Sequence, residues 1–404
     1  MNILYINHYA GSPKHGMEYR PYYMSREWIK AGNRVRIVAS AYSHVRSVQP
    51  NINGLENVDG VEYYWVPATK YFENGVRRVL NIFSFLFVFF VRLKSILNDF
   101  KPDVVIASST YPLDIYLSRF IAKKYSAKLI FEVHDLWPLS PIELGGMSKD
   151  HPFIRLCQHA ENFAYKHADS VVSMLPVVHE HMEKHGLDLN RLTVIPNGVS
   201  VVEWDYKKNL LRDDIREFIL SSKNNGYRIL CYAGAHGLPN GLDYLIDAAT
   251  LVSDEKVRII LVGDGLDKAR LVNKVKSGGV DNVFFFPPIP KNQIPTLLDL
   301  IDIAYIGLQY QPLFRFGISP NKMMDYMMAG KPIISAIDAG NNPVKDANCG
   351  VSVSPDPNAI ADGIVKLLKL SKAELMILGA NGHDYVTKNH SYDILGDKFI
   401  KVMK

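Results

Sequence analysis

The sequence contains 404 residues, of which 48% are hydrophobic and 22% are charged. This length exceeds what one hydrophobic core usually supports, so we expect two domains of ordinary size. The average composition argues against extensive disorder. A net charge of +5 without a long run of Lys or Arg gives little support for a nucleic-acid partner.

The three cysteines, Cys157, Cys231 and Cys349, are widely spaced and lie in apolar surroundings. An odd number of isolated cysteines favours reduced core thiols over disulfides or a zinc site. The N-terminus lacks both a basic region and a small-residue cleavage site, so no signal peptide is expected. These features predict a cytoplasmic protein.

The first half of the chain alternates short apolar runs with segments of helical length. A strand at 3–6, a helix at 24–31 that stops at Gly32, and a strand at 35–39 form the first predicted unit. Further strands are expected at 61–66, 104–107, 129–133, 170–173 and 193–195. This rhythm predicts a parallel sheet with helices on both faces, which binds ligands beyond the carboxyl ends of its strands.

The loop after the first strand contains Gly11, His15 and Gly16. It does not follow the G-x-G-x-x-G pattern, so a dinucleotide fingerprint is absent. Glycines at this edge let the backbone approach a ligand, which makes the loop a candidate binding element. A plain surface turn explains the same residues equally well.

Segment 77–94 is the most hydrophobic part of the chain, and basic residues stand at both of its ends. The apolar run between Arg78 and Arg92 is too short to span a bilayer. One interpretation is a crossover helix buried on the sheet. The other is a helix in a membrane interface, with basic flanks on anionic lipid and with Phe85 and Phe89 inserted into it.

His134 and Asp135 follow the predicted strand 129–133 and lie at its carboxyl end, where α/β folds place their chemistry. A histidine there can hydrogen-bond a substrate hydroxyl or take up a proton near neutral pH. The alternative is a buried histidine bonded to backbone. The position favours a catalytic role for His134. The long helix expected at 152–168 carries Glu161, which could face either water or a ligand.

A second α/β rhythm begins after the polar stretch 204–227, which we interpret as the linker between two domains. Strands are expected at 228–233, 257–262, 283–286 and 302–306. The turn after the first of them contains small and polar residues, Gly234, Ala235, His236 and Gly237. A glycine-rich turn between a strand and a helix can cradle a phosphate. No Gly-Lys-Ser/Thr follows, so it is not a P-loop.

The most informative stretch of the second half is 316–335. Ser319 followed by Pro320 predicts an N-cap and the first residue of a helix. A helix start offers N–H groups and the positive dipole end to an anion such as a pyrophosphate, and Lys322 would add charge. Asp325, one turn later, can reach a sugar hydroxyl. The alternative is a capped helix with a solvated lysine.

Five motifs in this order resemble glycosyltransferase family 4 of the GT-B fold. They are Val133-His134-Asp135, Ile195-Pro196-Asn197-Gly198-Val199, Tyr232-Ala233-Gly234, Leu261-Val262-Gly263-Asp264-Gly265 and Met324-Asp325-Tyr326-Met327-Met328-Ala329-Gly330-Lys331-Pro332. The resemblance covers essentially the whole chain. It implies an α/β fold of two doubly wound parallel-sheet, Rossmann-like domains that face a cleft. Residues 1–203 would bind the acceptor, residues 204–390 would bind the donor, and a terminal helix at 391–404 would pack back toward the first domain.

The resemblance also implies an activity and its partners. The expected reaction is a retaining transfer of a hexosyl or N-acetylhexosaminyl group from a nucleotide sugar, with a UDP-linked amino or deoxy sugar as the expected donor. The expected acceptor is a glycan or a polyprenyl-diphosphate-linked glycan of surface-polysaccharide biosynthesis, such as O-antigen or capsule. Peripheral contact with the inner face of the cytoplasmic membrane is expected, and no nucleic-acid partner is.

The family's functional positions fall on defined residues of this chain. Its ribose-binding carboxylate corresponds to Asp325, where glutamate is usual, and its N-terminal histidine corresponds to His134. The candidate donor-binding residues are Gly234, Ala235, His236, Gly237, Ile289, Ser319, Pro320, Asn321 and Asp325. The candidate acceptor-binding residues are Gly11, His15, Gly16 and Asp135.

Three positions depart from the family pattern. Ala235 and Asn240 stand where an arginine and a lysine are usual, and Gly317 replaces the first glutamate of the paired-acid motif. The loop 313–322 resembles instead the fucosaminyltransferase-like branch of surface-polysaccharide transferases.

Two cations of that loop, Arg315 and Lys322, are therefore expected to replace the missing charge and to stabilise the leaving phosphate. With His134 they are the catalytic candidates. No Asp-x-Asp triplet occurs in the sequence, so neither a metal nor another cofactor is expected. Two alternatives remain open: a GT-B nucleotide-sugar epimerase, and a non-catalytic subunit that binds a sugar nucleotide or a glycan.

Overall fold

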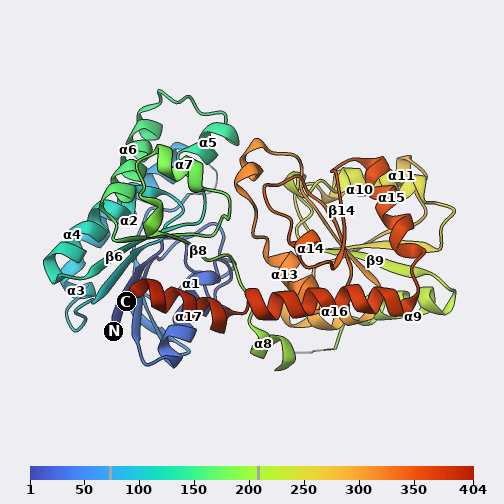
Figure 1. Cartoon of the computed structure of the whole chain (residues 1–404), viewed down its shortest axis with the longest axis horizontal. Coiled ribbons are helices and arrows are strands. Elements are labelled where there is room, and N and C mark those ends of the chain that lie inside the picture. The colour runs from blue at the N-terminus through green and yellow to red at the C-terminus, as the bar shows by residue number, and fades with distance from the viewer. Residues whose placement is uncertain (72–74, 207–209) are drawn as a thin grey trace. The chain divides into compact units, whose positions relative to one another are not determined.

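The computed structural model describes residues 1–71, 75–206 and 210–404 of the chain (Figure 1). It divides into two compact units, the first made of Met1–Asn197 with Tyr392–Lys404 and the second of Gly198–Ser391. The domain boundary expected after residue 203 falls inside helix α8 (Val201–Tyr206). Residues 207–209 of the predicted linker lie outside the described residues.

The first unit is built on an eight-stranded sheet with the order β3-β4-β2-β1-β5-β6-β7-β8. Its strands are β1 (Asn2–Ile6), β2 (Arg34–Ser40), β3 (Gly54–Val58), β4 (Val61–Val66), β5 (Val104–Ala107), β6 (Lys128–Val133), β7 (Ser170–Ser173) and β8 (Leu192–Val194). Neighbouring strands are parallel except β3 and β4, which pair antiparallel. The sequence analysis missed β3. Its signal is the Asp59-Gly60 pair, whose positive φ angles of 52° and 90° make a tight hairpin turn.

Helices cover this sheet, and the last of them comes from the C-terminus. They are α1 (Arg20–Lys30), α2 (Val76–Val91), α3 (Leu93–Ile96), α4 (Ile115–Tyr125), α5 (Leu139–Glu143), α6 (Pro152–His167), α7 (His179–Lys184) and α17 (Tyr392–Met403), with short turns η1 (Pro112–Asp114) and η2 (Leu189–Arg191). The rings of Trp28 on α1 and Phe399 on α17 lie 4.9 Å apart. The terminal helix therefore completes the core of the first unit (Figure 1).

Helix α2 has one buried face and one exposed face. Phe85 and Phe89 are fully buried against the sheet, whereas Phe83 and Phe87 are 42% and 68% exposed. The expectation that Phe85 and Phe89 insert into lipid is therefore wrong, because their rings fill the core. The crossover-helix interpretation holds for that face, and the outer face remains apolar. No helix in the described part of the chain is long and apolar enough to cross a membrane.

The second unit is built on a six-stranded, fully parallel sheet with the order β11-β10-β9-β12-β13-β14. Its strands are β9 (Arg228–Ala233), β10 (Val257–Val262), β11 (Val283–Phe286), β12 (Ile303–Gly307), β13 (Ile333–Ala336) and β14 (Gly350–Val353). Its helices are α8, α9 (Asp213–Asn224), α10 (Leu242–Leu251), α11 (Lys268–Ser277), α12 (Ile294–Leu300), α13 (Asn321–Met328), α14 (Pro343–Asp346), α15 (Pro357–Leu368) and α16 (Lys372–Asn389), with turns η3 (Leu238–Asn240), η4 (Lys291–Gln293) and η5 (Pro312–Phe316).

Both sheets reverse their strand order once, between β1 and β5 in the first unit and between β9 and β12 in the second. The prediction of two doubly wound parallel-sheet domains is confirmed. In such sheets the loops beyond the carboxyl ends diverge at the reversal and leave a crevice for ligand. The loops at these points follow β1 and β5 in the first unit and β9 and β12 in the second. The loops after β6 and β10 lie next to them, since β6 pairs with β5 and β10 pairs with β9.

Candidate functional site

In the first unit, the carboxyl end of β6 presents His134 on a network of polar side chains. The side chain of His134 is 9% exposed. Its Nε2 lies 2.8 Å from Ser108 Oγ and 3.4 Å from Glu132 Oε2. Ser108 follows β5, the neighbouring strand, so the sheet itself sets the position of the imidazole.

Glu132 is the centre of this network and is fully buried. Arg20, also buried, contacts its carboxylate at 2.9 Å, and the Tyr5 hydroxyl donates to it at 2.5 Å. Burial alone would raise the pKa of Glu132, but the Arg20 charge and the hydrogen bonds from His134 and Tyr5 outweigh it and hold that pKa well below its usual range. Glu132 is therefore a fixed negative charge beneath the histidine.

The hydrogen bonds assign roles to the ring nitrogens of His134. Ser108 has one hydroxyl proton and donates it to Glu132 Oε2 at 2.7 Å. An ionised carboxylate only accepts, so Ser108 Oγ must accept from Nε2–H of His134. That arrangement leaves Nδ1 as the ring atom that can accept a proton or a hydrogen bond from a ligand.

Sequence reasoning placed His134 but missed Arg20, Glu132 and Ser108. A signal for Glu132 was present, because it is a charged residue inside the apolar run 128–133 of a parallel strand. Such strands are buried on both faces, and a buried carboxylate needs a partner. The identity of that partner was not accessible, since Arg20 lies 112 positions earlier in the chain.

The other candidates of the first unit divide into two groups. Asp135 is exposed and borders, with Trp137, a small cavity of about 10 Å³ next to the β6 end. His15 is only 1% exposed, and its Nδ1 lies 2.8 Å from Ser12 Oγ. A Cβ on Gly11 would lie 2.0 Å from the Gly16 carbonyl oxygen, so this glycine lets the loop fold onto itself. The packing favours the turn interpretation for Gly11, His15 and Gly16.

In the second unit, the ends of β9, β10 and β11 surround a cavity of about 260 Å³. Gly234, Ala235 and Ile289, three of the predicted donor-binding residues, line it together with Gly263. A Cβ on Gly263 would lie 1.9 Å from the Gly234 carbonyl oxygen, so only glycine allows the two loops to approach so closely. The motifs after β9 and β10 thus form one wall.

Lys322 lies in the first turn of α13, beside the glycine-rich turn. Its Nζ donates to the Tyr232 hydroxyl at 2.7 Å and to Asn240 Oδ1 at 2.9 Å. A Cβ on Gly234 would lie 2.9 Å from the same Nζ. Burial lowers the pKa of Lys322 to about 8. The structure therefore brings Lys322 to the turn where family members usually have basic residues, and Asn240 helps to hold it there.

The start of α13 differs by one residue from the prediction. The N-cap is Pro320, with an extended ψ of 127°, and the helix begins at Asn321 without a side-chain cap. The expected capping by Ser319 is therefore wrong. The preceding loop is held instead by Asn341, which accepts from the Ile318 N–H at 2.8 Å and donates to its carbonyl at 3.0 Å. These two bonds replace the cap in fixing the loop.

Asp325 and Arg315 occupy different surroundings. Asp325 is half-buried, and burial raises its pKa to about 6, with Lys291 acting in the opposite direction. Arg315 is exposed in η5, donates to the Pro312 carbonyl oxygen at 2.6 Å and stacks 4.4 Å from the Phe316 ring. The structure thus places Asp325 one turn beyond Lys322, while Arg315 contacts its own segment.

His236 and Gly237 complete the predicted donor set. His236 is fully buried, and neither ring nitrogen has a hydrogen-bond partner among the described residues. Burial, with help from the Lys268 charge, lowers its pKa to about 4, so the ring is neutral near pH 7. Gly237 precedes the short turn η3. His236 lies behind the turn rather than on its surface, and its backbone N–H bonds the Asp264 carbonyl at 2.8 Å.

Each half of the chain matches a known domain family. Residues 15–198 match the Glycosyl transferase 4-like domain, and residues 227–370 match Glycosyl transferases group 1. Among curated proteins, the probable glycosyltransferase WbjE of Pseudomonas aeruginosa is 26% identical over 78% of this chain and 76% of its own. The putative colanic acid biosynthesis glycosyl transferase WcaI of Escherichia coli K12 is 23% identical over 86% and 87% of the two chains.

Solved structures match over the whole chain. Sucrose-phosphate synthase of Thermosynechococcus elongatus superposes with a TM-score of 0.75 at 16% identity, covering 100% of this chain and 98% of its own. HepE of Anabaena, solved in complex with UDP, has a TM-score of 0.68 at 15% identity and covers 100% and 99%. The chain is thus a glycosyltransferase of the GT-B fold that combines a glycosyl transferase 4-like domain with a group 1 domain.

Proposed function

We propose that this glycosyltransferase moves a sugar, with retention, from a UDP-sugar to a glycan or polyprenyl-diphosphate-linked glycan acceptor during surface-polysaccharide biosynthesis. The observation that carries the proposal is the cavity of the second unit together with Lys322, whose Nζ lies beside Gly234 in the cavity wall. The name of WcaI, a putative colanic acid biosynthesis glycosyl transferase, supports the biosynthetic setting, and the complexes of HepE with UDP and UDP-glucose support the donor class.

The donor is held, in this proposal, by three parts of the second unit. The base and ribose occupy the cavity lined by Gly234 and Ile289, and the Asp325 carboxylate accepts from ribose hydroxyls. The diphosphate lies at the start of α13, where unpaired backbone N–H groups and the helix dipole favour an anion. Lys322 supplies the adjacent positive charge.

Transfer breaks the bond between the anomeric carbon and the diphosphate oxygen, and the pair of electrons leaves with the phosphate. Lys322 and the α13 N–H groups stabilise that developing charge, which is usually the largest catalytic contribution. The acceptor hydroxyl forms the new bond on the face that the diphosphate leaves, and its proton passes to the leaving phosphate oxygen. His134 holds a sugar hydroxyl through Nδ1, above the fixed charge of Glu132.

The exposed apolar face of α2, defined as Leu80, Phe83, Phe87 and Phe90, supports contact with the inner face of the cytoplasmic membrane. These four side chains are 42–68% exposed. The face continues to Phe120 of α4, whose ring lies 6.4 Å from that of Phe90. Exposed apolar surface flanked by Arg77 and Lys94 is typical of helices that lie on anionic lipid.

Vesicle flotation tests the membrane contact. A Phe83→Ser/Phe87→Ser variant should float less with anionic vesicles while its melting temperature stays unchanged, because neither ring fills the core. Leu266→Ser, at a fully exposed apolar position of the second unit, is the matched control. Wild-type flotation of the double variant would refute the contact.

A two-step assay tests the transfer itself. UDP-sugars, GDP-sugars and ADP-sugars are first compared for their effect on the melting temperature, since a ligand of the folded state raises it. The best donor is then incubated with and without a lipid-linked glycan. We expect UDP to be released only when the acceptor is added. Conversion of the UDP-sugar to its epimer without acceptor would indicate an epimerase, and donor binding without turnover would indicate a binding subunit.

A further inference from the structure

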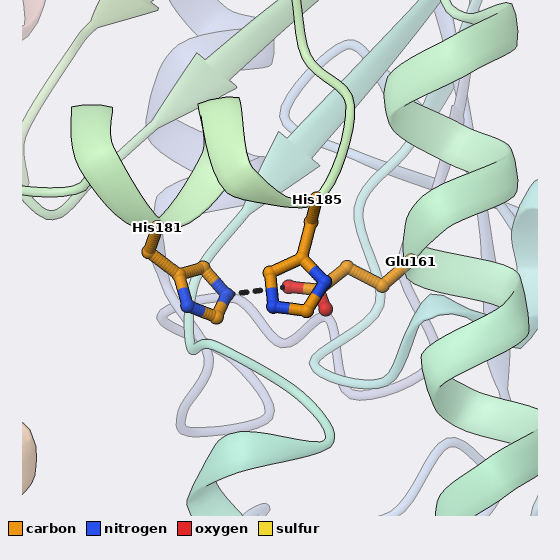
Figure 2. Close-up of side chains that lie close together, drawn as sticks. All are labelled: Glu161, His181 and His185. Carbon is orange, nitrogen blue, oxygen red and sulfur yellow. Dashed lines mark hydrogen bonds and ion pairs between the residues drawn. The ribbon is translucent and has the colours of Figure 1, made fainter.

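A cluster of three potential metal ligands joins α6 to α7 in the first unit. Glu161 comes from α6, His181 from α7, and His185 from the residue that caps α7 (Figure 2). The two histidines are four positions apart, so they lie on one side of the helix. Figure 2 shows the imidazole of His181 joined to the Glu161 carboxylate by a hydrogen bond, and the ring of His185 drawn beside them.

The distances suit a small divalent ion. One donor atom from each residue lies within 4.8 Å of the other two, and His181 Nε2 is 3.0 Å from Glu161 Oε1. Tetrahedral zinc with bonds of roughly 2.0–2.2 Å needs its ligand atoms roughly 3.3 Å apart.

The surroundings of Glu161 differ from those of the other buried carboxylate of this unit. Glu132 is neutralised by Arg20, whereas Glu161, only 2% exposed, pairs with no Lys or Arg among the described residues. Its oxygens accept from the neutral Tyr165 hydroxyl at 3.0 Å and from Gln158 Nε2 at 2.7 Å. A buried carboxylate is costly without a full positive charge beside it, and a metal ion would supply one.

The second layer of contacts also fits a metal centre. His185 Nδ1 lies 3.1 Å from Asn162 Oδ1 and 3.0 Å from Gln158 Nε2, so it donates to the amide oxygen in one tautomer and accepts from the amide nitrogen in the other. The first tautomer leaves His185 Nε2 with the lone pair that a metal requires. Ligating histidines generally donate their other ring N–H to such a partner, which fixes the ring.

We propose that Glu161, His181 and His185 bind one divalent transition-metal ion, for which zinc is the best chemical match, and that the ion fastens α7 to α6. Two imidazoles and one carboxylate are a common ligand set for zinc, with a fourth position open to water. Glu161 also lines the small cavity bordered by Asp135, so the ion would hold one wall beside the β6 end. The proposal is independent of the proposed transfer reaction, because it needs no sugar or nucleotide.

The test measures metal binding by the full, tag-free chain after treatment with EDTA and removal of the chelator. Zn²⁺ is followed by calorimetry and by the melting temperature, and Co²⁺ by its visible absorption. We expect one Zn²⁺ per chain, a higher melting temperature with Zn²⁺, and the intense visible bands of tetrahedral Co²⁺. Wild-type protein that shows no Zn²⁺ binding would overturn the proposal.

Variants assign the site. His181→Gln and His185→Gln should each weaken Zn²⁺ binding about ten-fold or more, the range usual for a lost contact in a metal site. His179→Gln, at an exposed position of the same helix, is the control and should bind as wild type does. Glu161→Gln removes a buried charge and can alter folding, so the His185→Gln result is decisive. Unchanged affinity in the His181→Gln/His185→Gln variant would place the ion elsewhere and refute the assignment.

Discussion

The two candidate sites hold their charged groups in opposite ways. Under His134, the Glu132 carboxylate is fully buried, paired with Arg20 and bonded to Tyr5, so its charge is satisfied before any ligand arrives. Lys322 is held by two neutral oxygens, from Tyr232 and Asn240, and burial lowers its pKa to about 8. The charges of the first site are thus paired within the protein, whereas the second site holds a cation that, in our proposal, pairs with the donor diphosphate.

The two sites should differ in what the loss of one charged group does to the free energy of unfolding. Removing a partner from a completed buried pair leaves an uncompensated charge and destabilises the fold. Removing a partly desolvated cation that has no anionic partner in the free protein removes its desolvation cost, so stability does not fall. The effect appears instead as weaker binding of the anionic ligand.

Arg20→Met should destabilise the protein by roughly 3–5 kcal/mol, because it strands the buried Glu132 charge. Urea denaturation, read by circular dichroism, measures the change. The double variant Arg20→Met/Glu132→Gln is the control and should recover much of the loss, since the stranded charge is gone. An Arg20→Met protein as stable as wild type would show that the pair contributes little.

His134→Ala should lower kcat by roughly two orders of magnitude or more, the usual effect of removing a positioned acid, base or hydrogen-bonding group. Donor affinity should stay near that of wild type, because the donor residues belong to the other unit. Calorimetry with UDP and steady-state rates separate the two quantities. Unchanged turnover would remove His134 from the mechanism.

Lys322→Met should weaken UDP binding by roughly 1.5–3 kcal/mol, the range for a charge-assisted contact to phosphate. Uridine should bind the variant as it binds wild type, since it has no phosphate. Asp325→Ala should weaken uridine and UDP alike, because it removes ribose contacts. Titration of both ligands against both variants separates the phosphate-binding role from the ribose-binding role. Wild-type UDP affinity in Lys322→Met would show that the role of the lysine is structural.

The pH dependence follows from the lowered pKa of Lys322, about 8 in the folded protein against 10.5 for the free side chain. Below pH 8 the ammonium is charged in both states, and burying it costs stability. Between about pH 8 and 10.5 the folded state binds fewer protons than the unfolded one, so this cost is relieved as pH rises. UDP affinity should fall over the same window in wild type and stay flat in Lys322→Met. A flat wild-type profile would contradict the assignment.

EDTA should leave the initial rate of transfer unchanged, because cationic and backbone donors serve the leaving phosphate in our proposal. The assay must include the His181→Gln/His185→Gln variant, in which the proposed metal site is already removed. If EDTA leaves the transfer rate of that variant and of wild type unchanged, the transfer chemistry does not depend on the α6–α7 site. Loss of activity that Mg²⁺ restores in both proteins would show that transfer needs a metal.

The local elements, and the strand and helix ends that carry the candidate residues, could be predicted from the amino-acid pattern alone. Apolar runs alternating with helical segments predicted both parallel sheets, because a strand buried on two faces must be apolar along its length. The same logic placed His134 after β6 and Lys322 near the start of α13. These conclusions held because periodicity and turn residues depend on neighbours in the chain.

Contacts between groups that are distant in the sequence follow from the folded arrangement. The fold pairs Arg20 with Glu132 and places the Asn240 side chain where it accepts a hydrogen bond from Lys322. It also buries Phe85 and exposes Phe87, although both rings lie on α2. Hydrophobicity could not separate those two rings, because both faces of α2 are apolar and the packing surface selects one. Contacts of this kind depend on the order of the strands in the sheet and on the space between the sheet and its helices. A local sequence pattern contains no information about either.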